Sequence, residues 1–264
     1  MQDINSHNTM KVKFKNPPLK EVVFSVNFET LKFSSVHFGK YWEMIKNEFP
    51  ILPEDKIPTS REEDILLSLP PLRRVVFGSE DEQSLIQLQK NNFAFNFRYK
   101  QDCEYPHFPK LLDEFSRHWK SFSDWWKLES GEQIAPPLHC KLTYLNIIDR
   151  EFGWQESKDN QKIFTVFQKN WQNYPQYPEL LNCETRFTLP DGLGYVDVDI
   201  QKGQIETDEL NKIDAMLFSL TAMSQDKPNN LVKWYNQTHD HILQIFSSLI
   251  REEIQESWGK SYEH

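Results

Sequence analysis

Two aspartates separated by one residue, Asp197 and Asp199, form the most enzyme-like pair in the chain. In an extended strand they share one face, and paired carboxylates can hold a hard metal ion or divide acid and base roles. The dipeptide Asp191-Gly192 in front of them is typical of tight β-hairpins, and a two-residue turn there sets Arg186 opposite Asp197 and Glu184 opposite Asp199. A cross-strand ion pair therefore explains Asp197, and we favour this structural role over catalysis.

Histidines offer a second route to chemistry. His239 falls inside the apolar arc of the last predicted helix, and His241 lies at the border of that arc. Helix residues two apart point in different directions, so these two cannot bind a metal as an i,i+4 pair does. We expect His239 to be buried and bonded to a sheet. His118, beside the apolar stripe of another helix, is expected to be packed or on the surface rather than catalytic.

Four polar side chains on predicted strands are candidates for a binding pocket: Asn96, Arg98, Tyr144 and Asn146. Arg98 can clamp a carboxylate or a phosphate. Helices packed on a curved antiparallel sheet can leave a pocket between the two layers, where such groups would orient a ligand. The alternative, which we favour for Asn96 and Arg98, is that they lie on a sheet face open to water.

These residues must be positioned by a sheet built around residues 73–99, which predict three consecutive antiparallel strands. Phe93, Phe95, Phe97 and Tyr99 alternate along the last of these strands and share one face. Burial of each ring stabilises the fold by about 1.5–3 kcal/mol, so this face belongs to the core. The opposite face of the strand is polar.

Each half of the chain predicts the element order β-α-β-β-β-α. An offset of 136−17=119 places Pro136 on Pro17, and carries the helix predicted at 108–127 onto another amphipathic helix. The fold class is therefore α+β, with two pseudo-repeats forming antiparallel sheet backed by long amphipathic helices. Predicted strands lie at 20–29, 182–189, 195–201 and 213–223, with another after Pro136, and helices at 37–49, 108–127, 162–171 and 230–253.

The expected organisation is a disordered tail at 1–15, a first repeat at 16–130 and a second at 131–264, together forming one unit. Residues 54–71 form a long charged connection, of the kind that is often functional or mobile. Cys103, Cys140 and Cys183 are too few and too far apart for a disulfide framework or a zinc site.

The composition limits the partners. A net charge of −9 over 264 residues argues against sequence-independent nucleic-acid binding, which depends on clustered Lys and Arg. No apolar run reaches the roughly 18 residues of a membrane span, and the N-terminus has no apolar signal core, so we expect a cytoplasmic protein without a membrane partner.

Several segments in order resemble a family: PPLKEVVFSVNF, SLIQLQKNNFAFNFRY, YPHFPKLLDEF, LTYLNII and HDHILQIFSSLIREEIQESWG. They are similar to a sporadically distributed, uncharacterised prokaryotic protein family, and the similarity spans nearly the whole chain. Family members usually show Asn-Trp-Arg where this chain has Asn96-Phe97-Arg98, a change that keeps both polar side chains. The resemblance implies no activity, but the patchy distribution is similar to that of mobile-element or anti-phage defence cargo.

We therefore expect a non-enzymatic protein-binding module, an accessory or regulatory component of a mobile-element or defence system, whose partner is encoded by a neighbouring gene. Three tryptophans lie outside the apolar stripes of the predicted helices and are candidate exposed anchors for a protein partner: Trp125, Trp154 and Trp258. The sequence is equally compatible with burial of each of them. The alternative is a small-molecule or nucleotide binder with a pocket between sheet and helices. No cofactor or metal is expected, a homo-oligomer is compatible with the sequence, and an enzyme using Asp197, Asp199 or His239 is the least favoured hypothesis.

Overall fold

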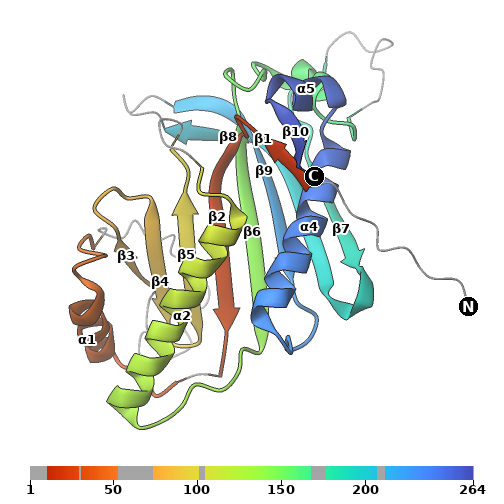
Figure 1. Ribbon diagram of the computed structural model, residues 1–264. Helices are drawn as coiled ribbons and strands as arrows, with labels where there is room; N and C mark the ends of the chain where they lie inside the picture. Colours follow the sequence, from red (N-terminus) through yellow and green to blue (C-terminus); the bar gives the residue numbers. More distant parts are fainter. Residues whose placement is uncertain are drawn as a thin grey trace, which may run out of the picture.

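One antiparallel sheet of eight strands runs through both halves of the chain (Figure 1). The computed structural model describes residues 11–29, 31–52, 74–100, 105–167, 177–206 and 212–263. From edge to edge the strands are β3 (Val75–Gly78), β4 (Ser84–Gln89), β5 (Asn92–Arg98), β2 (Leu19–Asn27), β6 (His139–Ile148), β9 (Lys212–Met223), β8 (Gly194–Glu206) and β7 (Cys183–Leu189). Strands β2 and β6 pair at the centre, so backbone hydrogen bonds join the two halves.

The long helices pack on one face of this sheet (Figure 1). They are α1 (Ser35–Ile45), α2 (Phe108–Ser130) and α4 (Leu231–Leu249). The expected α+β class, with antiparallel sheet backed by long helices, is confirmed. Within the described ranges no helix combines the length and the apolarity required to cross a membrane.

Local sequence signals set the ends of the two longest helices. At the end of α2, Gly131 has a φ of +72°, the left-handed conformation that commonly stops a helix and that glycine adopts without strain. At the start of α4, the Asn230 side chain accepts a hydrogen bond from the Lys233 backbone N–H at 2.8 Å. Between these ends, apolar residues recur every three or four positions and face the sheet.

Aromatic rings fill the layer between sheet and helices. Phe24 of β2 lies 5.3 Å from Phe115 of α2 and 5.3 Å from Tyr235 of α4, measured between ring centroids. The Tyr235 hydroxyl donates a hydrogen bond to the Ser25 carbonyl oxygen at 2.8 Å. A helix of the second half is thereby tied to a strand of the first half.

The three-strand segment predicted at 73–99 is confirmed as β3, β4 and β5. The register predicted for the β7–β8 hairpin is also confirmed, with Arg186 opposite Asp197 and Glu184 opposite Asp199. The turn itself differs from the two-residue prediction, because the last cross-strand pair is Leu189 with Gly194 and residues 190–193 form the connection.

Two predicted helices are shorter than expected. The helix predicted at 230–253 breaks after α4, because Ile250 has extended backbone and pairs with Phe164; a second short helix, α5 (Glu252–Ser257), follows. The same pairing limits the helix predicted at 162–171 to α3 (Asn160–Ile163), since Phe164 leaves the helix to form the bridge and is fully buried. Long-range pairing thus overrides helical periodicity at both positions.

The start of the chain is more ordered than predicted. Residues 11–14, expected to belong to a disordered tail, form β1 (Lys11–Phe14), which pairs with β10 (Lys260–Glu263) at the other end of the chain. The pairing partner lies about 250 positions away, which explains why local sequence does not reveal it. The predicted connection at 54–71 and Cys103 lie outside the described residues.

Candidate ligand-binding pocket

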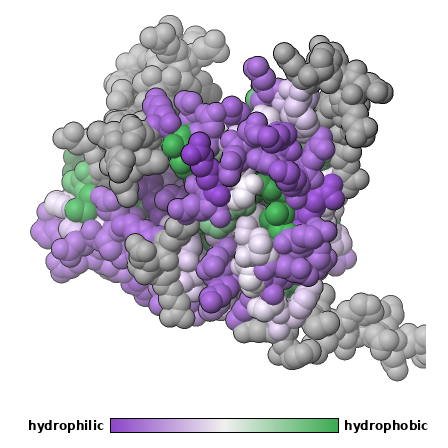
Figure 2. All heavy atoms as spheres, turned by 90° about the horizontal axis from the view of Figure 1, so that it is seen from above, coloured by the Kyte–Doolittle hydropathy of each residue, from purple (hydrophilic) through white to green (hydrophobic). Residues whose placement is uncertain are grey.

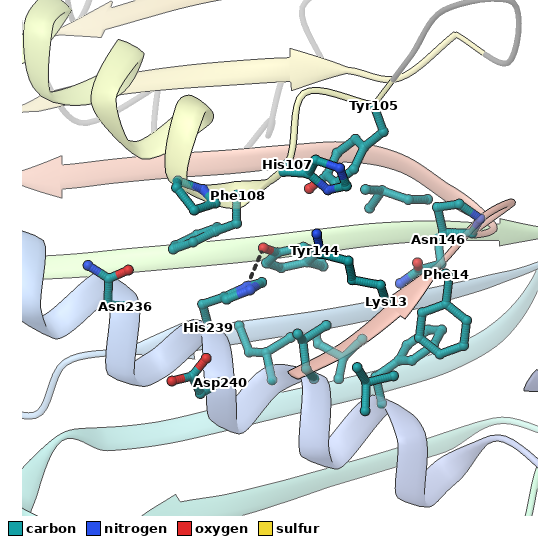
Figure 3. A pocket seen from close by; sticks show the side chains of 18 residues that line it. Lys13, Phe14, Tyr105, His107, Phe108, Tyr144, Asn146, Asn236, His239 and Asp240 are labelled. Atoms are coloured by element: carbon teal, nitrogen blue, oxygen red, sulfur yellow. Dashed lines mark hydrogen bonds between the residues drawn. The ribbon is translucent and has the colours of Figure 1, made fainter. Parts of the chain in front are cut away.

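A pocket of about 240 Å³ lies where α2 begins, between that helix, the middle of α4, the central strands β6 and β9, and β1 (Figure 3). Its volume corresponds to about eight liquid water molecules at roughly 30 Å³ each. Apolar side chains line most of it: Val12, Phe14, Leu19, Phe108, Leu220, Ile242, Leu243 and Phe246. The polar lining residues are Lys13, Tyr105, His107, Tyr144, Asn146, Asn236, His239 and Asp240.

The sheet contributes Tyr144 and Asn146 to the pocket. They are two residues apart on β6 and therefore share a face, which the register with the neighbouring strands turns toward the helices. The Asn146 side-chain amide donates a hydrogen bond to the Phe218 carbonyl oxygen at 3.1 Å, which holds its orientation. Both side chains are buried, so the polar groups they bring into this layer are shielded from bulk water.

The helix α4 contributes His239, which is held from two sides. The Tyr144 hydroxyl lies 2.7 Å from His239 Nδ1, a hydrogen bond drawn as a dashed line in Figure 3. The Phe108 ring, at the start of α2, stacks on the imidazole with centroids 3.8 Å apart and planes 1° apart. The prediction that His239 bonds to the sheet is confirmed, although the residue is half-buried rather than buried.

Two phenol groups of the pocket remain protonated at neutral pH. Burial is the main cause that raises the pKa of Tyr144 well above 10, and the neighbouring Tyr105 and Asp240 raise it further. Burial likewise raises the pKa of Tyr105, against a smaller lowering effect of its hydrogen bond with Tyr144. Each phenol has a single proton, and the Tyr144 hydroxyl is hydrogen-bonded both to His239 and to Tyr105, so at most one proton of the two phenols is left for a bound group. Neither phenol ionises readily enough to act as a base.

Strand β1 also lines the pocket, and its pairing with β10 near the C-terminus holds it in place. Phe14 packs edge-on against Phe246 of α4 at 5.5 Å between centroids. Beyond it, the Lys15 N–H donates to the Gly259 carbonyl oxygen at 3.2 Å. Gly259 has a φ of +76°, and a Cβ there would come within 2.7 Å of the Lys15 side chain, so this close approach requires glycine.

His107 lies directly before α2 with a φ of +24°, a conformation that residues other than glycine rarely adopt. Backbone outliers of this kind concentrate at functional positions, where the surrounding structure enforces them. Here the conformation accompanies the sharp entry into α2, and the next residue, Phe108, stacks on His239.

Only half of the predicted binding set meets in the pocket. Asn96 lies on the opposite face of the sheet, because Phe97 shares the face of Tyr144 in the β5–β2–β6 register and successive residues alternate. The Asn96 side-chain amide donates to Glu21 at 2.7 Å, and Arg98 forms an ion pair with the same carboxylate at 3.5 Å. The prediction that this polar face is open to water is therefore wrong for Asn96, which is only 3% exposed.

The tryptophans considered as exposed anchors are mostly internal. Trp154 is buried and its Nε1 donates to Asn160 at 2.6 Å, while Trp258 is buried against the Phe246 ring. Trp125 is half-buried against the aromatic layer beneath α1 and α2. Surface exposure is therefore wrong for Trp154 and Trp258. Trp258, which follows α5, packs against the rings of Phe152 and Phe246, so tertiary contacts bury it although it lies outside any helical stripe.

Of the two enzyme-like aspartates, Asp197 forms the predicted cross-strand ion pair. The Arg186 guanidinium forms hydrogen bonds of 2.5 and 2.8 Å with the two carboxylate oxygens of Asp197, as expected for a cross-strand ion pair. Burial and, to a lesser extent, Glu184 raise the pKa of Asp199. In the part of the chain that the structure describes, no group of His, Cys, Asp or Glu side chains is arranged to hold a metal ion.

Sequence reasoning missed Lys13, Tyr105, His107 and Asp240. Tyr105 and His107 are part of the YPHFP segment, in which three aromatic residues and two prolines occur at the start of a strong amphipathic helix. This concentration of rings at a helix start is a signal that could have identified them. Lys13 has no comparable signal, because it reaches the pocket only through the pairing of β1 with β10.

Comparisons with known proteins return no matching family model, no matching curated protein and no matching solved structure.

Proposed function

We propose that this protein binds a small organic molecule in the pocket between its sheet and its helices. The observation that carries this proposal is the hydrogen-bonded pair Tyr144–His239, which lies in a largely apolar cavity of about 240 Å³ beside the buried Asn146. A few fixed polar groups in an apolar concave site are typical of ligand pockets. The volume lies below the roughly 300–1,000 Å³ that drug-sized ligands need, which favours a smaller molecule.

The arrangement favours binding over catalysis. Its phenols have raised pKa values and its histidine is stacked and hydrogen-bonded, so the groups are suited to orient a ligand. The surface supports the same reading: among the described residues in Figure 2, hydrophobic side chains show only in small separate spots on a hydrophilic face. A broad apolar surface, which would favour a large protein interface, is not seen on that face.

The test is a thermal-shift screen of a metabolite library against the wild type and a variant with a filled pocket. Leu243 is half-buried on α4 and lines the pocket, so Leu243→Trp places a large ring inside it. A ligand at 100 times its Kd stabilises the folded state by about 2.7 kcal/mol, which raises the Tm by about 5–10 °C in a chain of this size. The shift should disappear in Leu243→Trp.

The matched control is Ile245→Trp, because Ile245 is half-buried on the same helix but does not line the pocket. This variant should keep the ligand-induced shift. Absence of any stabilising compound across the library, or equal shifts in both variants, would contradict binding at this site.

A second proposed function is the binding of another protein, as an accessory component of a mobile-element or defence system. The supporting observation is the sheet face opposite α1, α2 and α4, since these three helices all pack on the other face (Figure 1). On it, half-exposed Leu145, Leu217 and Tyr195 lie among polar neighbours, a mixture typical of interfaces. Co-expression with the product of a neighbouring gene, comparing the wild type with Leu145→Glu, tests this: a complex lost in the variant supports it, and no complex contradicts it.

We also infer that the two halves descend from a duplication. In support, the offset of 119 carries β2 onto β6 and α2 onto α4, within a few residues. The strand order outward from the centre is also equivalent, β2-β5-β4-β3 in one half and β6-β9-β8-β7 in the other. Superposition of the two halves tests the inference, which predicts equivalent positions for Pro17 and Pro136.

A further inference from the structure

We propose that the ligand of this pocket is a small aromatic carboxylate, whose acid group lies among Lys13, Tyr105 and Tyr144 and whose ring lies against the apolar wall. This inference rests on the proposed function and specifies the class of ligand. It follows from the placement of hydrogen-bond donors, from the planar walls and from the size of the cavity.

Hydrogen-bond donors converge on the side of the pocket where α2 begins (Figure 3). The ammonium group of Lys13 comes from β1, and the Tyr105 and Tyr144 hydroxyls come from the chain before α2 and from β6. His107 lies on the same side, directly before the first turn of α2, where the helix dipole is positive. The Lys13 ammonium, the positive end of α2 and at most one remaining phenol proton complement an anion, and the two oxygens of a carboxylate can interact with these groups at once.

The remaining walls suit a flat apolar ring. The stacked pair of Phe108 and His239 forms one planar side, while Leu220, Ile242 and Phe246 form an apolar floor. Aromatic pairs are stabilised beyond the burial of area alone, so a ring gains more here than an aliphatic chain does. The space of about 240 Å³ admits one substituted ring or a fused pair and is too small for a dinucleotide.

An acidic group in the pocket sets the orientation of the ligand. Asp240 is exposed on α4, one turn after Asn236, and both line the pocket from the helix side. Figure 3 shows Asp240 below His239 and Asn236 to the left of it, whereas Tyr105 and His107 lie above it. The negative charge of Asp240 also raises the pKa of Tyr144, so it opposes an anion on the helix side of the pocket and favours a carboxylate placed against Lys13 of β1.

The experiment compares three indoles of the same size: indole-3-carboxylate, indole-3-carboxamide and 3-(aminomethyl)indole. Isothermal titration calorimetry at pH 7.4 measures each Kd for the full-length wild type. We expect the carboxylate to bind at least tenfold more tightly than the neutral amide, and the cationic amine to bind most weakly. Lys13→Met keeps the length of the side chain but removes its charge, and should abolish the preference for the carboxylate over the amide.

Lys20→Met is the matched control, because Lys20 is exposed on β2 outside the pocket, and its Kd values should equal those of the wild type. Tyr144→Phe should weaken the binding of indole-3-carboxylate about tenfold, with folding checked by circular dichroism. If Tyr144→Phe is unstable, Lys13→Met gives the same information, because Lys13 is half-exposed and its replacement disturbs the core less. Equal affinities for the three indoles, tighter binding of the amine, or no binding of any of them overturns the ligand class. The proposed function fails separately, when no library compound gives a shift that Leu243→Trp removes.

Discussion

His118 gives this protein a pH-dependent stability that can be calculated from its surroundings. The imidazole is 4% exposed on α2, stacked on Phe95 and packed edge-on against Phe49. Burial, and then the positive charge of Arg117, lower its pKa from 6.5 to about 4, against an opposing effect of Glu48. The folded state therefore holds His118 neutral, as expected for a packed histidine.

The sign of the effect follows from this lowered pKa. Below pH 6.5 the unfolded chain binds a proton at His118 that the folded chain does not bind until the pH approaches 4. The contribution to stability is thus fully present above pH 6.5 and is lost as the pH falls toward 4. Between pH 7 and pH 5 the loss is about 2 kcal/mol, since a pKa difference of one unit corresponds to about 1.4 kcal/mol.

The perturbation is His118→Phe, which keeps an aromatic ring of similar size against Phe95 but cannot titrate. Urea denaturation, followed by tryptophan fluorescence at pH 7, 6 and 5, gives the unfolding free energy of each protein. From pH 7 to pH 5 the wild type should lose about 2 kcal/mol more than the variant. The control His139→Gln changes an exposed histidine and should follow the wild type. Parallel pH profiles for His118→Phe and the wild type would refute the reasoning.

Three further predictions concern stability, each measured by urea denaturation. Tyr235→Phe leaves the Ser25 carbonyl without its side-chain donor and should cost about 1–2 kcal/mol; a loss below 0.3 kcal/mol would show that the hydrogen bond does not hold α4. Gly194→Ala should prevent stable folding or cost at least about 3 kcal/mol, because the added Cβ would lie 1.9 Å from a backbone oxygen. Gly192→Ala has open space around the added Cβ and should cost only about 1 kcal/mol, for its positive φ. Equal costs for the two variants would contradict this geometry. Arg186→Gln breaks an exposed ion pair and should change stability by less than about 1 kcal/mol, so a larger loss would argue that this pair supports more than the hairpin.

Much of the fold could be predicted because it depends on neighbours in sequence. Alternation of rings at Phe93, Phe95 and Phe97 assigns β5 and its buried face, since successive side chains of any strand point to opposite sides. The Asp191-Gly192 turn sets the register that pairs Arg186 with its partner carboxylate, because a short turn allows few registers. These features need no knowledge of distant parts of the chain.

The pocket could be predicted only in part. Two of its polar groups, Tyr144 and Asn146, were among the candidates, but Asn96 and Arg98 were grouped with them. Which strand faces coincide depends on the pairing of β5, β2 and β6, segments that lie far apart in the chain. A shift of one residue in either register would reverse the grouping, and nothing local specifies that register.

The sequence by itself determined the class, the order and the apolar side of the central strands and of α1, α2 and α4, because period and turn chemistry are local properties. The tertiary structure alone decided that Lys13 at one end of the chain, Tyr105 in the middle and His239 near the other end surround one cavity. It also decided that Ile250 ends α4, since its pairing with Phe164 outweighs helical preference. The physical reason is that contacts between distant segments form only when the whole core closes, and no single window of sequence contains both partners.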